Sequence, residues 1–283
     1  MVRKALIPVA GKGIRLMPVT KATPKALFPL VDGGGKIYTV LDVICREAVW
    51  AGAKDIGIVI SPWQSDLIKK YLADARQNIL QDELSNIEFI TQQTPMGFGD
   101  AVLQARDFVA DEPFMLLLGD HIQIPDKGTP ACGLQLAQAF DSMDAQALVG
   151  MQAVTSEKLS RVGVAAGVPV RQNVYHCTFF IEKPDPETAR QKLQTPGLPP
   201  DNFLAHCGIY IFSPEIFDCL EEVKAKIDNS ADELELADAQ NLLLKKYPKK
   251  YFLYKINGLV YDTGTPEGYA RTQAAFRNAL QNL

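Results

Sequence analysis

Short apolar runs alternate with longer amphipathic stretches in the first half of the chain, and this alternation constrains the fold strongly. Each apolar run is too short for a helix and is bounded by Gly, Pro or polar residues. The runs predict buried strands at Ala5–Ala10, Asp55–Ser61, Ile87–Thr91 and Phe114–Gly119. Apolar spacings of three and four predict helices at Tyr38–Ala51, Gln64–Gln77 and Asp100–Val109. This order predicts an α/β fold of the Rossmann-like type, with a mostly parallel sheet flanked by helices.

The second half of the chain is less regular. Strands are predicted at Ala147–Val154, Tyr175–Glu182, Phe203–Phe212, Tyr251–Ile256 and Leu259–Tyr261. Helices are predicted from Pro214 to about Glu222, from about Glu233 to Tyr247 and from Pro266 to near Leu280. No Ser/Gly linker or block of like charge separates the two halves, so we expect a single domain over residues 1–283.

Composition excludes several classes of protein. The 29 Lys and Arg against 33 Asp and Glu give a net charge of −4, which provides no general basic field for nucleic acid. No apolar run approaches the ~20 residues of a membrane span, and the N-terminal run is too short for a signal peptide. The five cysteines form no C-x-x-C pair and are expected to be free thiols in a reducing compartment. We therefore expect a cytoplasmic protein without nucleic-acid or membrane partners.

A glycine-rich turn, Gly11-Lys-Gly13, follows the first predicted strand. Such a turn at the carboxyl end of a first strand is where open α/β sheets bind phosphates, because small residues let backbone N–H groups approach the anion. Leu16 occupies the position of the third glycine of a dinucleotide fingerprint, and no Gly-Lys-Ser/Thr of a P-loop is present. Taken alone, the turn is equally consistent with a tight strand–helix connection.

Three cations follow this turn within one proline-rich segment: Arg15, Lys21 and Lys25. Pro18, Pro24 and Pro29 disfavour a regular helix, so a stiffened loop is expected to present the cations beside backbone donors. Scattered surface charges are the alternative interpretation. The combination of glycines and cations in one loop favours a polyphosphate site.

At these residues the sequence resembles the sugar-phosphate nucleotidyltransferases, most closely the bacterial UTP–glucose-1-phosphate uridylyltransferase branch. The opening motifs are Gly11-Lys-Gly-Ile-Arg15 and Pro18-Val-Thr-Lys-Ala-Thr-Pro-Lys25. Further matches follow in order: Gln92 five residues before Gly97, Leu118-Gly-Asp120, Glu182-Lys-Pro184, Glu233-Leu-Glu-Leu-Ala-Asp238 and Tyr261-Asp-Thr-Gly264. The resemblance covers essentially the whole chain and implies the fold of nucleotide-diphospho-sugar transferases. It also implies a nucleotide-binding half over about residues 1–125 and a sugar-phosphate-binding half over about 126–283.

The sequence departs from the family pattern at three places. Ile14 stands where threonine is usual, Ala26-Leu-Phe28 replaces Glu-Met-Leu, and Gly119 stands where the uridylyltransferase branch often has proline. These differences bear on the nucleotide and the sugar more than on membership of the family.

Two aspartates are candidate metal ligands. Asp120 follows the Phe114–Gly119 run, and a carboxylate at the tip of a buried strand suits a cleft with a hard cation such as Mg²⁺. A turn aspartate is the alternative interpretation. The resemblance implies that Asp262 joins Asp120 across the cleft in a Mg²⁺ site.

The resemblance also assigns roles to the remaining site residues. It implies nucleotide binding by Ala10, Gly11, Gly13, Gln92 and Gly97, and sugar-phosphate binding by Gly163, Glu182, Lys183 and Gly208. It implies catalytic roles for Arg15, Lys25 and Lys183. Without the family, Glu182 and Lys183 would be interpreted as a surface ion pair before a proline turn. As adjacent strand residues they are expected to point to opposite faces.

Gln92 carries one amide donor group and one acceptor, which complement uracil or thymine or, in another rotamer, cytosine. The histidines His121, His176 and His206 form no catalytic arrangement and are interpreted as structural, His121 least so because it adjoins Asp120. The Lys245–Lys250 run is interpreted as a solvated helix end.

The expected reaction converts UTP and glucose 1-phosphate into UDP-glucose and pyrophosphate by Mg²⁺-assisted in-line displacement, in a homo-oligomer. The alternatives are a thymidylyl- or other sugar-1-phosphate nucleotidyltransferase, and a non-catalytic nucleotide- or sugar-binding regulator of the same fold. A dinucleotide-dependent oxidoreductase is disfavoured by the missing third glycine.

Overall fold

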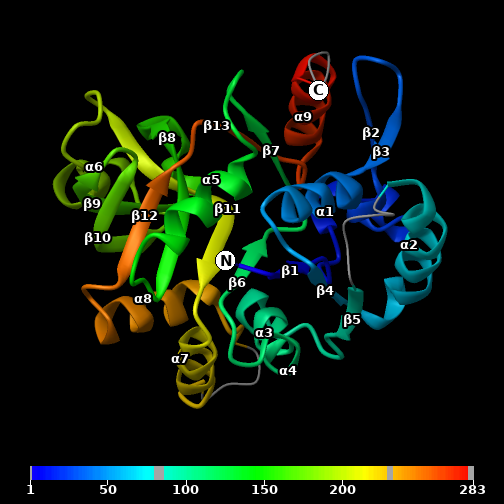
Figure 1. Ribbon diagram of the computed structural model, residues 1–283, viewed down its shortest axis with the longest axis horizontal. Helices are drawn as coiled ribbons and strands as arrows, with labels where there is room; N and C mark the ends of the chain where they lie inside the picture. The colour runs from blue at the N-terminus through cyan, green and yellow to red at the C-terminus, as the bar shows by residue number, and fades with distance from the viewer. Residues whose placement is uncertain (1, 80–85, 228–231, 280–283) are drawn as a thin grey trace.

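A nine-stranded sheet runs through the whole chain in the order β5-β4-β1-β6-β11-β8-β12-β10-β9 (Figure 1). The structure, a computed structural model, describes residues 2–79, 86–227 and 232–279. The first half of the chain supplies four parallel neighbours: β1 (Lys4–Pro8), β4 (Asp55–Ile60), β5 (Asn86–Thr91) and β6 (Phe114–Leu117). Their carboxyl ends therefore meet at one edge of the sheet.

The second half supplies the other five strands: β8 (Ala147–Thr155), β9 (Gly163–Arg171), β10 (Val174–Glu182), β11 (Asn202–Phe212) and β12 (Tyr251–Lys255). Only β11 and β10 run against the direction shared by the other seven described strands, so the sheet is mostly parallel. The outer strand β9 also pairs back with β11, at Leu204 with Ala165, so this end of the sheet curls on itself.

Helices cover both faces of the sheet, because alternate residues of the buried strands point to opposite sides. Ile7 packs into a core with α1 (Val40–Trp50), α2 (Ser65–Ile79), α5 (Cys132–Asp141) and α9 (Pro266–Ala279). Leu6 packs into the opposite core with α3 (Phe98–Leu103), α4 (Arg106–Val109), α7 (Glu215–Lys224) and α8 (Leu236–Lys246). The helices α3, α4, α7 and α8 lie together along the lower side of the molecule in Figure 1.

Smaller elements complete the described fold. Two antiparallel pairs lie outside the main sheet: β2 (Pro29–Val31) with β3 (Ile37–Thr39), and β7 (His121–Pro125) with β13 (Gly258–Asp262). Helix α6 (Pro186–Lys192) covers a third, small apolar cluster beside β8, β9 and β11. Short 3-10 turns lie at Ile14–Leu16, Val19–Lys21, Lys25–Leu27, Pro62–Gln64 and Ser156–Arg161. The three turns in the proline-rich segment agree with the expectation that it forms no regular helix.

The alternation in the first half predicted the four parallel strands and the helices α1 and α2, although Tyr38 and Thr39, placed in the predicted first helix, belong to β3. The predicted helix at Asp100–Val109 is wrong as a single element, because α3 ends at Leu103 and α4 begins at Arg106. Ala105 between them has a ψ of 7°, which breaks the helix. The first helix shows why sequence and structure agree elsewhere: Thr39 and Asp42 form a reciprocal capping box at its start, and Val40, Ile44 and Ala48 are fully buried. The predicted end of the last helix near Leu280 lies outside the described residues.

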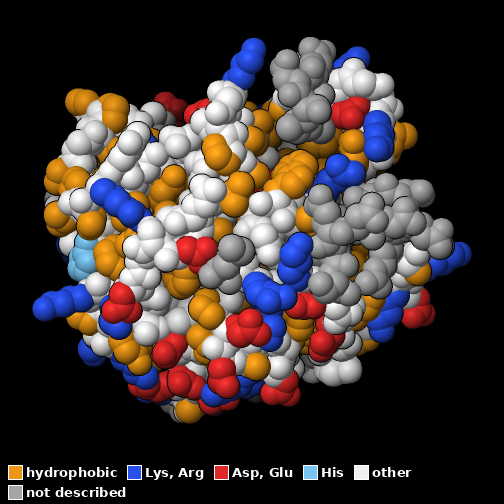
Figure 2. Space-filling view, viewed as in Figure 1, with side chains coloured by type: hydrophobic (Ala, Val, Ile, Leu, Met, Phe, Trp, Pro, Cys, Tyr) orange, Lys and Arg blue, Asp and Glu red, His pale blue; other side chains and the backbone are white. Residues whose placement is uncertain are grey.

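Charged side chains of both signs are mixed on the face of the molecule in Figure 2, with acidic groups gathered along its lower edge. Arg106 pairs with Asp218 at 2.8 Å, and Lys246 pairs with Glu222 at 2.6 Å. The predicted helix end is confirmed, because Lys245 and Lys246 lie in the last turn of α8, although Lys246 is paired with Glu222 and not only solvated. All five cysteines are free and buried. Within the described ranges, no helix is long and apolar enough to cross a membrane.

Candidate active site

A pocket of about 550 Å³ lies at the carboxyl ends of β1, β5 and β6. Seven of the predicted site residues line it: Ala10, Gly11, Gly13, Lys25, Gln92, Gly97 and Asp120. The lining also includes Lys12, Ile14 and Glu233, to which the sequence analysis gave no role in the site. Glycines, a lysine and an aspartate thus meet where open α/β sheets bind ligands.

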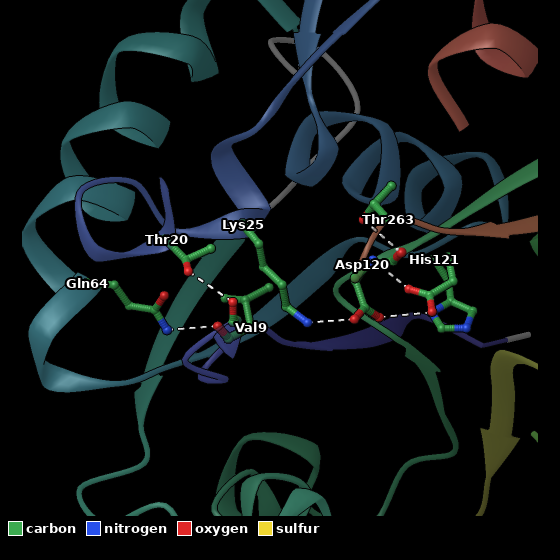
Figure 3. A network of polar contacts seen from close by, with 10 residues as sticks. Val9, Thr20, Lys25, Gln64, Asp120, His121 and Thr263 are labelled. Atoms are coloured by element: carbon green, nitrogen blue, oxygen red, sulfur yellow. Dashed lines mark hydrogen bonds and ion pairs between the residues drawn. The ribbon is translucent and has the colours of Figure 1, made fainter. Parts of the chain in front are cut away.

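The glycine loop is held in shape from beneath. Gly13 has a φ of +63°, and a Cβ there would lie 2.9 Å from the Thr20 side chain, so only glycine suits this turn. The Thr20 hydroxyl donates to the Gly13 carbonyl at 2.9 Å. Gln64 donates to the Val9 carbonyl at 2.7 Å, as Figure 3 shows. The loop geometry is therefore held by contacts within the chain itself.

Lys25 and Asp120 form the polar centre of the pocket. The Lys25 ammonium lies 2.5 Å from Asp120 Oδ2, and His121 Nδ1 lies 2.8 Å from Asp120 Oδ1 (Figure 3). Burial of Asp120 opposes its ionisation, but the Lys25 charge and the His121 hydrogen bond outweigh burial and hold its pKa well below the ordinary value. For His121, burial is outweighed by Asp120 and Asp262, which raise its pKa.

Asp120, His121 and Asp262 lie close enough to hold one divalent metal ion, since one possible ligand atom from each lies within 4.8 Å of the others. Thr263 joins the two strands that carry them, because its N–H and its hydroxyl both donate to the Asp120 carbonyl, at 2.8 and 2.9 Å. The Arg15 guanidinium lies beside the same two carboxylates, next to Gly264. A Cβ on Gly264 would lie 2.9 Å from Arg15 Nη2 and 2.8 Å from Asp262 Oδ1.

Sequence reasoning assigned no ligand role to His121, although its position directly after Asp120 was a usable signal. The structure places its ring against both carboxylates. Gly208 borders the same ring, since a Cβ there would lie 2.8 Å from His121 Cδ2. Gly208 has a φ of +75° and lies where the pairing of β11 with β8 shifts register.

Gln92 lies at the opposite wall of the pocket and is 5% exposed. Its amide nitrogen donates to the Gly97 carbonyl at 3.1 Å and to Asp100 Oδ2 at 2.9 Å. Gly97 has a φ of +103°, and a Cβ there would lie 2.6 Å from the Leu234 carbonyl. The segment that carries Glu233 thus packs directly on residues Met96–Gly99 at the start of α3.

The predicted sugar-phosphate residues Glu182, Lys183 and Gly163 do not line this pocket. They form a separate group at the end of β10, where a Cβ on Gly163 would lie 2.7 Å from Glu182 Oε2. The expectation that Glu182 and Lys183 point to opposite faces is wrong. Lys183 has left the strand with a φ of +48°, and its ammonium lies 3.5 Å from Glu182 Oε1.

The two groups are connected through the segment before α8. The pKa of Glu235 is raised, chiefly by burial and by the negative charge of the neighbouring Glu233. The charge of Glu182 raises this pKa further, and the charge of Lys183 opposes the increase. Glu233 belongs to the pocket lining, while Glu182 and Lys183 lie near enough to act on Glu235. Lys25 therefore lies in a buried pocket, and Lys183 lies in a more exposed group outside the lining of that pocket.

Comparison with known proteins shows which family has this sequence and fold. Residues 4–279 match the family model described as nucleotidyl transferase. The chain belongs to the nucleotidyl transferase family. A UTP–glucose-1-phosphate uridylyltransferase of Bacillus subtilis (strain 168) is 34% identical over 292 residues, covering 97% of this chain and 91% of the relative. One of Streptococcus pyogenes (serotype M3, strain ATCC BAA-595 / MGAS315) is 34% identical and covers 96% of this chain and 87% of the relative.

A solved structure confirms the fold of this nucleotidyl transferase. A UDP-glucose pyrophosphorylase complexed with UDP-glucose superimposes with a TM-score of 0.80 at 26% identity, covering 98% of this chain and 99% of that one. The predicted α/β fold and the predicted family are thus confirmed.

Proposed function

We propose that this nucleotidyl transferase makes UDP-glucose and pyrophosphate from UTP and glucose 1-phosphate. The observation that carries the proposal is the pocket that joins the Gly11–Gly13 loop and Lys25 to Asp120 at one end and Gln92 at the other. One end suits a polyphosphate and the other a planar base with hydrogen-bonding groups. Relatives and a solved structure named for this activity cover nearly the whole chain, which supports the choice of substrates.

In this reaction an oxygen of the sugar phosphate attacks the α-phosphorus of UTP, and the bond from that phosphorus to pyrophosphate breaks. The attacking phosphate is already an anion, so the reaction needs neither a general base nor a covalent intermediate. It needs two mutually repelling anions held in line, with their charge neutralised. The residues at the cleft match this need, because they are cations, carboxylates and glycine backbone rather than a nucleophile.

Each cation then has a distinct task. We assign the backbone of the Gly11–Gly13 loop and Arg15 to the triphosphate and its departing pyrophosphate. Lys25 is assigned to the α-phosphate, where negative charge increases in the transition state. Lys183 and Glu182 are assigned to the sugar phosphate, Lys183 to its phosphate and Glu182 to sugar hydroxyl groups. Gly163 and Gly208 allow the sugar to approach the backbone closely.

We propose Mg²⁺ as the metal, held by Asp120 and Asp262 with His121 beside them. The donors fit, because two carboxylates present hard oxygen ligands within 4.8 Å of each other. When bound, Mg²⁺ supplies charge neutralisation to the phosphates. Lys25 occupies Oδ2 of Asp120 here, so it is placed to turn from the carboxylate to the substrate phosphate.

The test is an assay of purified protein with glucose 1-phosphate, Mg²⁺ and, separately, UTP, dTTP, CTP, ATP and GTP. Release of pyrophosphate and formation of the nucleotide-sugar are both measured. We expect UTP to have the highest kcat/KM and the purine triphosphates to be poor substrates. Higher kcat/KM for another triphosphate, or binding without turnover for all five, would refute the proposed activity.

A further inference from the structure

The amide of Gln92 has only one atom left for a ligand. Both hydrogens of its nitrogen are used, one by the Gly97 carbonyl at 3.1 Å and one by Asp100 Oδ2 at 2.9 Å. Within the described part of the chain, no residue donates a hydrogen bond to Gln92 Oε1. Since Gln92 lines the pocket, this oxygen is the group it offers there.

The orientation of this amide is fixed by chemistry. A backbone carbonyl and a carboxylate are both acceptors, so the end of the Gln92 amide that faces them must be the NH₂ group. Rotation by 180° would bring Oε1 against two acceptors and leave both unpaired in a buried place, which is unfavourable. The Gln92 side chain therefore presents a lone acceptor.

Asp100 is itself held firmly. It lies in the first turn of α3, is 3% exposed, and has its second oxygen 3.2 Å from the Lys224 ammonium. Gln104, one turn further along the helix region, also donates to Oδ1 at 3.2 Å. The carboxylate thus links α7 and the start of α3 to the amide in the pocket.

We propose that Asp100 is a positioning residue that makes the base site select uracil over cytosine, an inference that rests on the proposed function. A lone acceptor at Gln92 Oε1 complements the N3–H donor of uracil. Cytosine has an unprotonated N3 at the same position, so its lone pair would face the Gln92 oxygen. The sequence left both bases open, because a free Gln92 could present either end of its amide; Asp100 and the Gly97 carbonyl together remove that freedom.

Asp100→Asn tests the proposal with almost no change of shape. An asparagine amide can accept from the Gln92 NH₂ or donate to the Gln92 oxygen, so in this variant only the Gly97 carbonyl still favours one orientation. We expect the ratio of UTP to CTP affinity, measured by titration calorimetry, to fall about 10-fold, since one charge-assisted hydrogen bond no longer fixes the amide. Affinity for CTP should rise while affinity for UTP falls.

Two further variants distinguish positioning from a structural effect. Gln104→Ala removes a neighbour of the other Asp100 oxygen and should leave the UTP to CTP ratio unchanged. In a Gln92→Ala background, Asp100→Asn should no longer change the ratio, because Asp100 acts only through Gln92. Thermal unfolding of all variants checks that they remain folded.

The inference is overturned if Asp100→Asn keeps the wild-type ratio, or if it changes the ratio equally with and without Gln92. A variant that does not fold is replaced by Asp100→Glu, whose acceptor-only side chain should retain the preference for UTP, and loss of that preference would count against the proposal. Because the readout is binding, it is separate from turnover. A wild-type protein that binds UTP without making UDP-glucose refutes the proposed function and leaves this inference testable.

Discussion

The two sides of the cleft differ in how completely they are built before substrates bind. On the nucleotide side, the side chains of Lys25 and Asp120 are 17% and 13% exposed and are in contact with each other. On the sugar side, those of Lys183 and Glu182 are 61% and 44% exposed, and their charges are 3.5 Å apart. Preorganised groups lose little freedom on binding, whereas exposed long side chains must be ordered by the ligand. We therefore expect the pocket proposed for the nucleotide to bind its ligand without the sugar phosphate.

The architecture explains this contrast. The pocket proposed for the nucleotide lies where the parallel strands β1, β5 and β6 end together, and Phe98 and Ala101 of α3 also line it. The sugar side lies at the end of β10, next to the outermost strand β9. β1 and β6 lie inside the sheet and their ends are buried, whereas only β9 lies beyond β10 and the Glu182 side chain at its end is 44% exposed.

The largest expected effect is at the buried centre of the nucleotide side. Asp120→Asn should lower kcat about 10²–10³-fold with the fold intact, because an amide cannot neutralise the metal and the Lys25 ammonium. Steady-state turnover at saturating Mg²⁺ measures it, and circular dichroism checks the fold. Asp126→Asn, at an exposed carboxyl six residues further on, is the matched control. Near-wild-type turnover of Asp120→Asn would remove Asp120 from the metal site.

A buried carboxyl with no ion-pair partner among the described residues sharpens the comparison, since burial alone raises the pKa of a carboxyl group. Glu47 on α1 accepts a hydrogen bond from the Gly133 N–H, and burial raises its pKa to about 7. The folded state thus binds a proton more tightly than the unfolded state, whose glutamate titrates near 4.5. The stabilisation is complete below about pH 4.5 and is lost as pH rises through 7.

Over that range, wild type should lose up to about 3 kcal/mol of unfolding free energy relative to Glu47→Gln. Urea unfolding between pH 4.5 and 8 measures the difference, with the exposed Glu157→Gln as control. Parallel pH profiles of wild type and Glu47→Gln would show that burial of this carboxyl has no such consequence.

A smaller effect is expected on the exposed side. Lys183→Ala should raise KM for glucose 1-phosphate about 10- to 100-fold, the value of one lost charge-assisted contact. The Kd for UTP should stay within about 5-fold, because the two anions occupy different ends of the cleft. Lys192→Ala on α6 controls for loss of surface charge. A large loss of UTP affinity with an unchanged KM for glucose 1-phosphate would show that Lys183 contacts UTP and not the sugar phosphate.

Sequence alone predicted the parallel strands of the first half well, because local patterns determine them. Short apolar runs separated by amphipathic helices are typical of parallel strands, and β1, β4, β5 and β6 lie where expected. The second half depends on antiparallel pairing, which leaves weaker signals. The hairpin of β9 and β10 turns at Asn173 with a φ of +62° and without the usual glycine, so β9 was not predicted. The strands β2, β3 and β7 and the helices α5 and α6 were also not predicted.

The candidate site was predictable only in part. The glycine loop and Asp120 could be found because their motifs are contiguous. The pairing of Lys25 with Asp120 joins residues 95 positions apart and depends on the sheet order. The role of Asp100 follows from one hydrogen bond to Gln92, and its position in a predicted helix did not reveal that contact.

The most direct test of this account is a calorimetric titration of the protein, in the presence of Mg²⁺, with UTP alone and with glucose 1-phosphate alone. A prebuilt nucleotide side predicts that UTP binds without the sugar phosphate, with a Kd at least about 10-fold lower than that of glucose 1-phosphate. Tight binding of glucose 1-phosphate alone, with no binding of UTP in its absence, would contradict the account.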